Sequence, residues 1–224
     1  MVIKDCLKKY SNGYYDDMFG FYGKVDTKSR HKAEEFLKSY ALDNKDFQQK
    51  CLPLMQNVFK HSNNCEFDIR KSSANELFQE GFQIYIHISS PMFTEESYLY
   101  IQKICKVCKD EYFYIVEDNN DSSAFQLRIP ATTKWENLVS GGFISIVLFN
   151  MPYNKYKVFG DSGNWGKWCD YDNPWVDYEI FGTKVDFIDV KNYNSLMELS
   201  EKELSYLPEK IKEIMKMGSR GLTF

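Results

Sequence analysis

Residues Phe143–Gly182 have the sequence FISIVLFNMPYNKYKVFGDSGNWGKWCDYDNPWVDYEIFG. Eleven of these forty residues are aromatic and three of the four tryptophans lie among them, although aromatic residues make up only 17% of the whole chain. Large aromatic side chains contribute much of the stability of protein cores and much of the energy of protein contact surfaces. The stretch therefore directs both the fold prediction and the search for a site.

Two strands are predicted in the first half of this stretch. The run 143–149 is rich in apolar and β-branched residues and follows Gly141-Gly142, which is typical of a central strand buried on both faces. Residues 155–159 alternate lysine with aromatic or aliphatic side chains, which predicts a strand with one solvent-exposed face. The five residues 150–154 between them have the length of a hairpin loop.

Three glycines lie within the seven residues 160–166, beside Asp161 and Trp165. Such a sequence is typical of a tight turn in which Asp161 or Asn164 bonds to nearby backbone groups. The alternative is a recognition loop whose glycines leave the Trp165 ring exposed. The sequence leaves both interpretations open.

Acidic residues gather after this turn. Between residues 160 and 190 there are seven carboxylates and two lysines, a local charge of −5, while the whole chain has a net charge of −4. A negative surface with aromatic anchors suits a basic partner, because complementary charge speeds encounter and buried rings supply contact energy. The candidate binding residues are Asp161, Trp165, Trp168, Asp170, Tyr171, Asp172, Trp175, Asp177 and Tyr178.

The same aromatic residues have a second interpretation, because large aromatic side chains usually belong to a core. Exposure decides between the two. A contact surface requires Trp165, Trp168 and Trp175 to be at least partly exposed on one side, with carboxylates around them. An enzyme requires instead a concave pocket that holds several carboxylates or a histidine.

The rest of the chain predicts helices and strands in alternation. Apolar residues recur at helical spacing between Lys28 and Tyr40, and a second helix is predicted over 45–60 with a bend at Pro53. We expect these two helices to form an N-terminal hairpin that turns near Asp43-Asn44. The other predicted elements are strands at 82–88, 112–117 and 125–129, helices at 94–108 and 132–139, and C-terminal helices that begin at the capping box Ser200–Glu203.

These elements predict an α+β fold with a mostly antiparallel sheet and helices packed on one side, because the links between strands have hairpin length. The chain contains no internal repeat and no low-complexity linker, so we expect a single domain over residues 1–224. A domain boundary near Asn63 or Asn119 is the alternative.

Composition narrows the class of protein. A net charge of −4 and a pI near 5.5 argue against a general affinity for nucleic acids, which requires a basic surface. The sequence contains no apolar run of ~18 residues that could span a membrane, and its start lacks the apolar region of a secretory signal. Six cysteines without such a signal indicate free thiols in a reducing compartment. We therefore expect a cytoplasmic protein, with its oligomeric state left open.

Catalytic motifs are missing from the sequence. Cys105 and Cys108 form its only CxxC, but they lie late in an apolar helical stripe, which favours core packing over a metal or redox site. His87 lies on the polar side of a predicted strand without a partner motif, which is typical of a solvated residue. The sequence has no phosphate-loop, serine-hydrolase or zinc-protease motif. We expect neither a cofactor nor a bound metal.

Two functions fit these observations. The preferred one is a non-enzymatic protein-binding module that uses the aromatic and acidic residues. In general texture such a small acidic α+β protein is similar to bacterial immunity proteins that block a basic toxin nuclease, and this similarity, which rests on no diagnostic motif, implies a basic protein partner. The alternative is a metal-dependent or carbohydrate-active hydrolase, in which carboxylates such as Asp170 and Asp172 bind a cation or act as acid and base.

Overall fold

The computed structural model describes residues 27–61, 76–88, 95–118, 124–140, 144, 155–170, 178–186 and 209. Its helices are α2 (Thr27–Tyr40), α3 (Asn44–Asp46), the π-helical turn η2 (Phe47–Cys51), α4 (Leu52–Val58), α5 (Glu95–Cys108) and α6 (Trp135–Leu138). Its strands are β1 (Gln83–Ile88), β2 (Tyr112–Glu117), β3 (Gln126–Pro130), β4 (Lys155–Gly160), β5 (Trp165–Asp170) and β6 (Tyr178–Thr183). Among these described helices none is long and apolar enough to cross a membrane.

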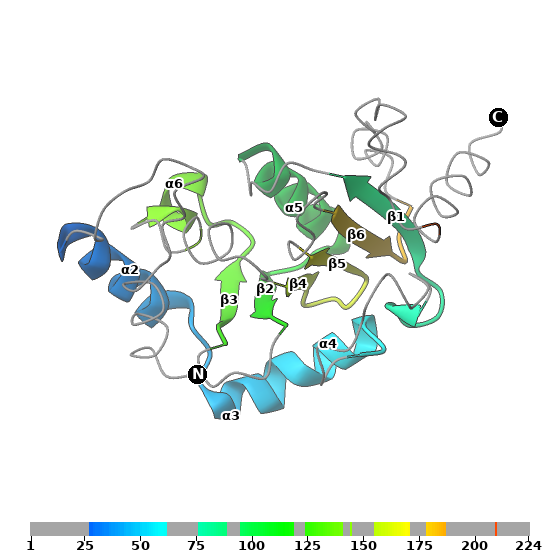
Figure 1. Ribbon diagram of the computed structural model, residues 1–224, viewed down its shortest axis with the longest axis horizontal. Coiled ribbons are helices and arrows are strands. Elements are labelled where there is room, and N and C mark those ends of the chain that lie inside the picture. Colours follow the sequence, from blue (N-terminus) through cyan, green and yellow to red (C-terminus); the bar gives the residue numbers. More distant parts are fainter. Residues whose placement is uncertain are drawn as a thin grey trace.

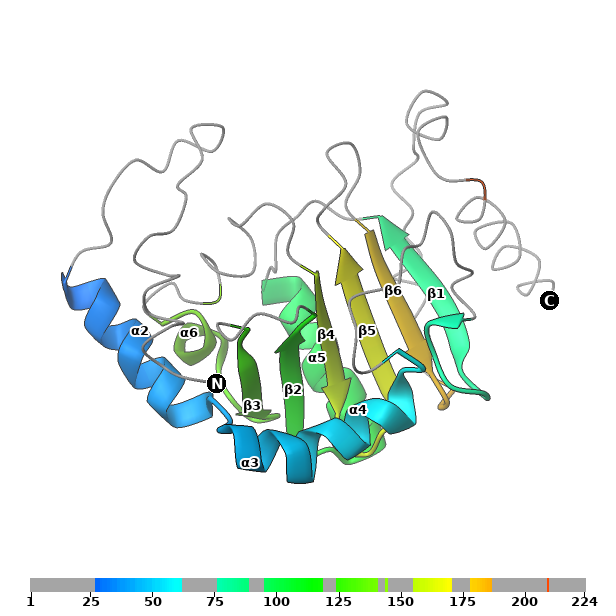
Figure 2. The same ribbon diagram turned by 60° about the horizontal axis from the view of Figure 1, so that its bottom comes forward.

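The six strands form one antiparallel sheet in the order β1-β6-β5-β4-β2-β3 (Figures 1 and 2). Consecutive strands pair directly in β2–β3, β4–β5 and β5–β6, whereas β1 closes one edge by pairing with the last strand, β6. The predicted α+β class and antiparallel sheet are confirmed. The six strands nevertheless include β5 and β6, which the sequence interpretation treated as a turn and a contact surface.

Helices cover both faces of the sheet, so the prediction that they pack on one side is wrong. Figure 2 shows α5 behind the sheet and α4 in front of it. The alternating side chains of β2 show the same division, because Ile115 belongs to the core beneath α5 and Tyr114 to the core beneath α4. The core on the α4 side consists of Leu42, Cys51, Met55, Val58, Phe59, Leu77, Phe78, Tyr114, Val116, Phe159, Trp168 and Ile180.

Because both faces are covered, β4 has no solvent-exposed face. The alternation in its sequence predicts that Lys157 points to water, but this side chain is only 1% exposed. Tyr156 and Val158 enter the other core, beneath α5. The period-two pattern correctly predicted a strand at 155–159, but the lysine on its polar side marks a buried charge and not a wet surface.

The N-terminal helices follow each other closely, as their apolar spacing predicted. Asp43 caps α3, since its carboxylate oxygen Oδ1 accepts the Asp46 N–H at 2.7 Å. The predicted disturbance at Pro53 coincides with the end of η2 and the first turn of α4, where a proline N–H is not needed. The helical hairpin is not confirmed, because Phe36 of α2 and Met55 of α4 belong to different cores.

Most other predicted elements are confirmed with small shifts in their bounds: β1, β2, β3, β4, α5 and α6 all lie where the sequence placed a strand or helix. The predicted strand at 143–149 lies outside the described residues except for Ile144, which is buried and has helical backbone. The predicted C-terminal helices also lie outside them, apart from residue 209.

Candidate functional site

The predicted binding residues divide between the two ends of the sheet. Register pairs Trp165 with Thr183 at one end of the β5–β6 hairpin and Asp170 with Tyr178 at the other. A strand rises about 3.3 Å per residue, so these ends are separated by roughly 17 Å. Asp161 and Trp165 therefore lie at one end of the sheet, and Asp170 and Tyr178 lie at the opposite end.

Trp165 and Trp168 are completely buried, with 0% of each side chain exposed. The expectation that these two rings are partly exposed on one contact surface is therefore wrong for both. They point to opposite faces of β5: Trp165 enters the core beneath α5, and Trp168 enters the core beneath α4. A strand covered on both faces carries large apolar side chains in both directions, which is why WGKWC shows no apolar and polar alternation.

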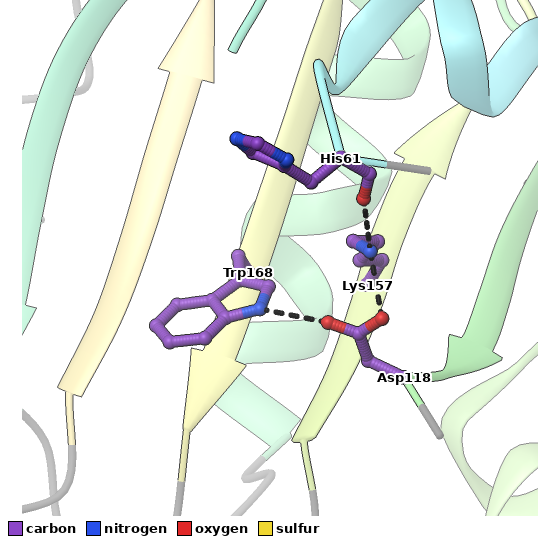
Figure 3. A network of polar contacts seen from close by, with 4 residues as sticks. All are labelled: His61, Asp118, Lys157 and Trp168. Carbon is purple, nitrogen blue, oxygen red and sulfur yellow. Dashed lines mark hydrogen bonds and ion pairs between the residues drawn. The ribbon is translucent and has the colours of Figure 1, made fainter. Parts of the chain in front are cut away.

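Trp168 takes part in a buried polar network (Figure 3). Its indole Nε1–H donates to Asp118 Oδ2 at 3.2 Å, and the Lys157 ammonium donates to Asp118 Oδ1 at 2.7 Å. The same ammonium donates to the His61 carbonyl oxygen at 2.8 Å. The network thus joins the end of β2, the centre of β4, the centre of β5 and the chain that follows α4.

A second buried ion pair lies on the other face of the sheet. Lys167 Nζ lies 2.7 Å from Glu179 Oε1, and both side chains are almost completely buried. Burial acts to lower the pKa of Lys167, but the adjacent Glu179 carboxylate, with a smaller contribution from Cys169, outweighs it, so the pKa of Lys167 is raised. Lys167 therefore stays charged in the core, and the buried Glu179 side chain is not part of an acidic surface.

At the other end of the sheet, Asp161 and Trp165 flank a tight turn. Asp161–Asn164 connect β4 to β5, and the Gly163 N–H donates to the Gly160 carbonyl at 3.2 Å. The turn is anchored by Asp110, whose carboxylate oxygens accept the Ser162 N–H at 2.6 Å and the Trp165 indole N–H at 2.7 Å. The turn interpretation of this glycine-rich sequence is therefore confirmed, although Asp161 bonds to Tyr112 and not to its own neighbours.

The remaining candidate residues run from Asp170 to Tyr178 in the sequence, and we call the end of the sheet at Asp170 and Tyr178 its acidic end. Asp170 and Tyr178 are neighbours in register, and their backbone positions are described. Residues 171–177 connect them, so the predictions for Tyr171, Asp172, Trp175 and Asp177 lie outside the described residues. The contact surface predicted from these four residues therefore stays a prediction.

The alternative chemical sites depend on reactive thiols or on clustered metal ligands. Both cysteines lie on α5, where Cys105 is buried and Cys108 is half-buried, which agrees with core packing of the CxxC. Burial raises the pKa of the Cys108 thiol to about 11, with a further rise from Asp110, so this thiol is not an activated nucleophile. Within the described part of the chain no cluster of three or more His, Cys, Asp or Glu side chains is arranged to hold a metal ion.

No family model, no curated protein and no solved structure matches this chain. Function must therefore be inferred from the residues themselves.

Sequence reasoning missed the residues that organise the interior: Asp110, Asp118, Lys157, Lys167 and Glu179. Carboxylates and lysines are normally assigned to the surface, because an unpaired buried charge is too costly. The available signal was that each lysine lies between large apolar neighbours, Lys157 between Tyr156 and Val158 and Lys167 before Trp168. Their partners come from other strands, so no spacing along the chain reveals them.

Proposed function

We propose that this protein is a non-enzymatic protein-binding module whose contact surface lies at the acidic end of the sheet. The contact residues of this proposal are the six of the predicted set that run from Asp170 to Tyr178 in the sequence: Asp170, Tyr171, Asp172, Trp175, Asp177 and Tyr178. The partner is a basic protein, and an immunity-type inhibitor of a basic toxin nuclease is the specific form of this proposal.

One observation carries the proposal: Asp170 and Tyr178 are register partners at the end of the β5–β6 hairpin. The seven residues between them in the sequence therefore start and finish at one end of the sheet, and the proposal assigns their acidic and aromatic side chains to a contact surface there. Loops held on a rigid scaffold are common binding elements. Trp175 and Tyr171 supply aromatic anchors, and Asp170, Asp172 and Asp177 supply charge complementary to a basic partner.

Burial of Trp165 and Trp168 supports this narrower site, because it removes the two tryptophans from any surface and leaves Trp175 as the tryptophan of the proposed contact. The Lys167–Glu179 pair also supports this narrower site. It places a neutralised pair in the core beneath this end and leaves Asp170, Asp172 and Asp177 as the acidic residues of the proposed contact surface.

The test is affinity capture from the native cell lysate with three immobilised proteins: the wild type, an Asp170→Asn/Asp172→Asn/Asp177→Asn variant, and a matched control. The control, Glu80→Gln/Glu111→Gln/Asp186→Asn, removes the same charge from exposed residues at the opposite end of the sheet. We expect the wild type and the control to retain a basic protein that the first variant loses at least ~10-fold, with binding that weakens as salt increases.

The partner is then purified, and its binding is measured by calorimetry. If it has nuclease activity, a stoichiometric amount of this protein should inhibit that activity. Equal retention by all three proteins would exclude the acidic end as the contact surface. The hydrolase alternative would then be tested with chromogenic glycosides and phosphodiesters, with and without divalent cations.

A further inference from the structure

The sheet has two edge strands, β3 and β1, which lie at its opposite sides in Figure 2. In an antiparallel pair, one residue turns its N–H and its C=O towards the neighbouring strand, and the next residue turns both away from it. Every second residue of an edge strand therefore directs two hydrogen-bonding groups out of the sheet, where another strand can bind. The two edges of this sheet differ in how those groups are bonded.

Other parts of the chain cover both ends of the outer edge of β3. The Gln126 carbonyl accepts the Leu42 N–H at 2.8 Å, and the Pro130 carbonyl accepts the Thr133 N–H at 2.9 Å. Pro130 also has no N–H of its own. These bonds and the proline oppose the addition of a further strand at this edge.

The other edge strand, β1, directs the backbone groups of Ile84, Ile86 and Ile88 out of the sheet. The Lys184 N–H donates to the Asn164 carbonyl at 2.8 Å, so alternation along the ladder turns the even-numbered residues of β6 towards β5. The odd-numbered residues of β6 therefore face β1, and their register partners on β1 are also odd-numbered. The three isoleucines lie at the even-numbered positions, so their N–H and C=O groups point away from β6.

Nothing that protects β3 is found at β1. No hydrogen bond joins the outward backbone groups of β1 to any residue that the structure describes. The strand QIYIHI contains no proline and no lysine, arginine, aspartate or glutamate, and its register with β6 runs without a bulge from Gln83 to Ile88. Charged residues, prolines and bulges are the usual means by which edge strands avoid further pairing. β1 therefore has the properties of a strand that accepts a neighbour.

A second β1 strand that runs antiparallel fits this edge. Hydrogen bonds form only where outward-facing residues lie opposite each other. An alignment centred on Ile86 meets this condition along the strand, because Ile86 lies opposite Ile86 of the second copy and Ile84 lies opposite Ile88. Three pairs that exchange two bonds each give about six backbone hydrogen bonds. Tyr85 then lies opposite His87, so no like charges from lysine, arginine, aspartate or glutamate face each other within the paired strands.

The absence of charge also favours a second copy over a charged partner strand. Complementary charge selects a basic or acidic partner, and β1 carries none with which to do so. The position of the outward groups is instead matched to the same strand turned by a two-fold axis, the commonest symmetry of protein oligomers.

We propose that β1 forms the interface of a symmetric dimer, in which the β1 strands of two copies pair antiparallel about Ile86 and join the two sheets into one. Because the paired strands run in opposite directions, the acidic ends of the two copies point in opposite directions. The dimer does not depend on the binding function proposed above, since its evidence is the backbone bonding of β1.

The first experiment uses the unmodified protein. Sedimentation equilibrium between ~1 and ~300 μM should show a species of twice the chain mass of 26.5 kDa, with a share that increases with concentration unless the dimer already forms at the lowest one. A protein that stays monomeric over this range would overturn the proposal.

Amide hydrogen exchange by NMR then tests the interface itself. In the dimer we expect the N–H groups of Ile84 and Ile88 to be protected at least ~10-fold more than in a monomeric Ile86→Pro variant, while the Tyr85 N–H, which faces β6, is protected in both. A dimer in which Ile84 and Ile88 exchange rapidly would place the interface elsewhere. Protection of both N–H groups in a monomeric wild type would show that the chain covers its own edge, and it would equally refute the proposal.

Ile86→Pro removes the central outward N–H, a change that an edge strand tolerates because this group makes no bond within the sheet. It should weaken dimerisation at least ~10-fold, since a lost interfacial bond and a misplaced ring disturb the centre of the interface. The matched control is Arg128→Pro, which changes the middle residue of the other edge strand and should dimerise as the wild type does. Circular dichroism verifies that both variants fold. Equal dimerisation of all three proteins would exclude β1 as the interface.

A cysteine at position 86 tests the alignment even if the proline variant does not fold. Opposite residues of a hydrogen-bonded pair have Cα atoms about 5.5 Å apart, within the range of a disulfide. After mild oxidation with oxidised glutathione, Ile86→Cys should give a disulfide between position 86 of two copies, identified by mass spectrometry of peptides. The control Tyr85→Cys should not, because its two copies lie roughly 7–8 Å apart on a diagonal. A missing disulfide at position 86, or equal yields at both positions, would contradict the alignment.

Discussion

Gly166 of β5 and Gly182 of β6 are register partners, and aromatic rings from the α4 side lie directly on both. A Cβ at Gly182 would lie 2.8 Å from the Phe78 ring, and a Cβ at Gly166 would lie 2.9 Å from Cζ of Phe59. The two rings also contact each other, with centroids 5.2 Å apart. Glycine is required at both positions so that this aromatic layer can approach the backbone of the sheet.

Gly182→Ala should therefore lower the free energy of unfolding by about 1–3 kcal/mol, the range for overpacking a core. Urea unfolding followed by circular dichroism measures this change. In the double variant Gly182→Ala/Phe78→Leu, the smaller side chain relieves the contact, so the two changes should cost less than the sum of their separate effects. Strict additivity would show that the added methyl group does not meet the Phe78 ring.

Removing one member of the Lys157–Asp118 pair should cost much more than removing both charges. Lys157→Met leaves the Asp118 carboxylate buried and uncompensated, so we expect a loss of about 3–5 kcal/mol. Lys157→Met/Asp118→Asn should recover most of it, because the asparagine oxygen still accepts the Trp168 indole N–H. Urea unfolding of the wild type, the two single variants and the double variant measures the four free energies of a double-mutant cycle. A double variant as unstable as Lys157→Met would contradict this explanation.

Burial, with a further contribution from Asp110, raises the pKa of Asp161 to about 6, and this shift predicts how stability depends on pH. A carboxyl group whose folded-state pKa lies above its unfolded value binds its proton more tightly in the folded protein, so its stabilising effect is present at low pH. That effect is lost as the pH rises from about 4 through about 6. The stability of Asp161→Asn relative to the wild type should therefore increase by about 1 kcal/mol over this interval, after allowance for solvent screening. A constant difference from pH 4 to 7 would contradict the raised pKa.

The rate at which each cysteine reacts with a thiol reagent should depend on how deeply its side chain is buried. Burial raises the pKa of Cys51 and Cys105, and both side chains are 0% exposed. At pH 8 their modification by an aromatic disulfide reagent should be limited by unfolding, and Cys108 should react faster because it is half-buried. Mass spectrometry of peptides after timed quenching measures each rate. Rapid labelling of Cys51 in the folded protein would contradict its place beneath α4.

The single domain predicted from the sequence also has a direct test. The two cores share one sheet, with Tyr114 and Ile115 of β2 entering opposite sides, so neither core can lose its strands without the other. We expect tryptophan fluorescence and far-ultraviolet circular dichroism to report one coincident urea transition. Two separated transitions would instead favour the predicted alternative of a boundary within the chain.

Patterns of apolar residues along the sequence predicted most helices and strands correctly, but they did not predict which faces of the sheet the helices cover. The apolar run 112–117 placed β2, alternation in 125–129 placed β3, and apolar residues at helical spacing placed α5, because these signals depend only on neighbours along the chain. The same signals did not identify β5, where Trp165 and Trp168 face two different cores. Nothing within that strand indicates that helices from distant parts of the sequence cover both of its faces.

The candidate site shows the same limit. Aromatic and acidic composition drew attention to residues 143–182, but composition did not reveal that two of the tryptophans are internal. Nor did it reveal that Asp161 belongs to a turn at the far end from Asp170, because the separation follows from strand direction. What remains of the predicted surface is the part at one end of the β5–β6 hairpin.

Lys167 and Trp168 are adjacent in β5, yet they enter opposite sides of the sheet, and only one side offers Glu179. A slip of β5 by one residue would exchange them, bringing a second ammonium group beside Asp118 and Lys157 on the α4 side and leaving Glu179 unpaired in the other core. Aromatic and aliphatic side chains substitute for one another with little penalty, so they discriminate weakly between neighbouring alignments. We therefore expect the buried ion pair to favour the correct strand alignment during assembly, a contribution to uniqueness of the fold and not to its stability.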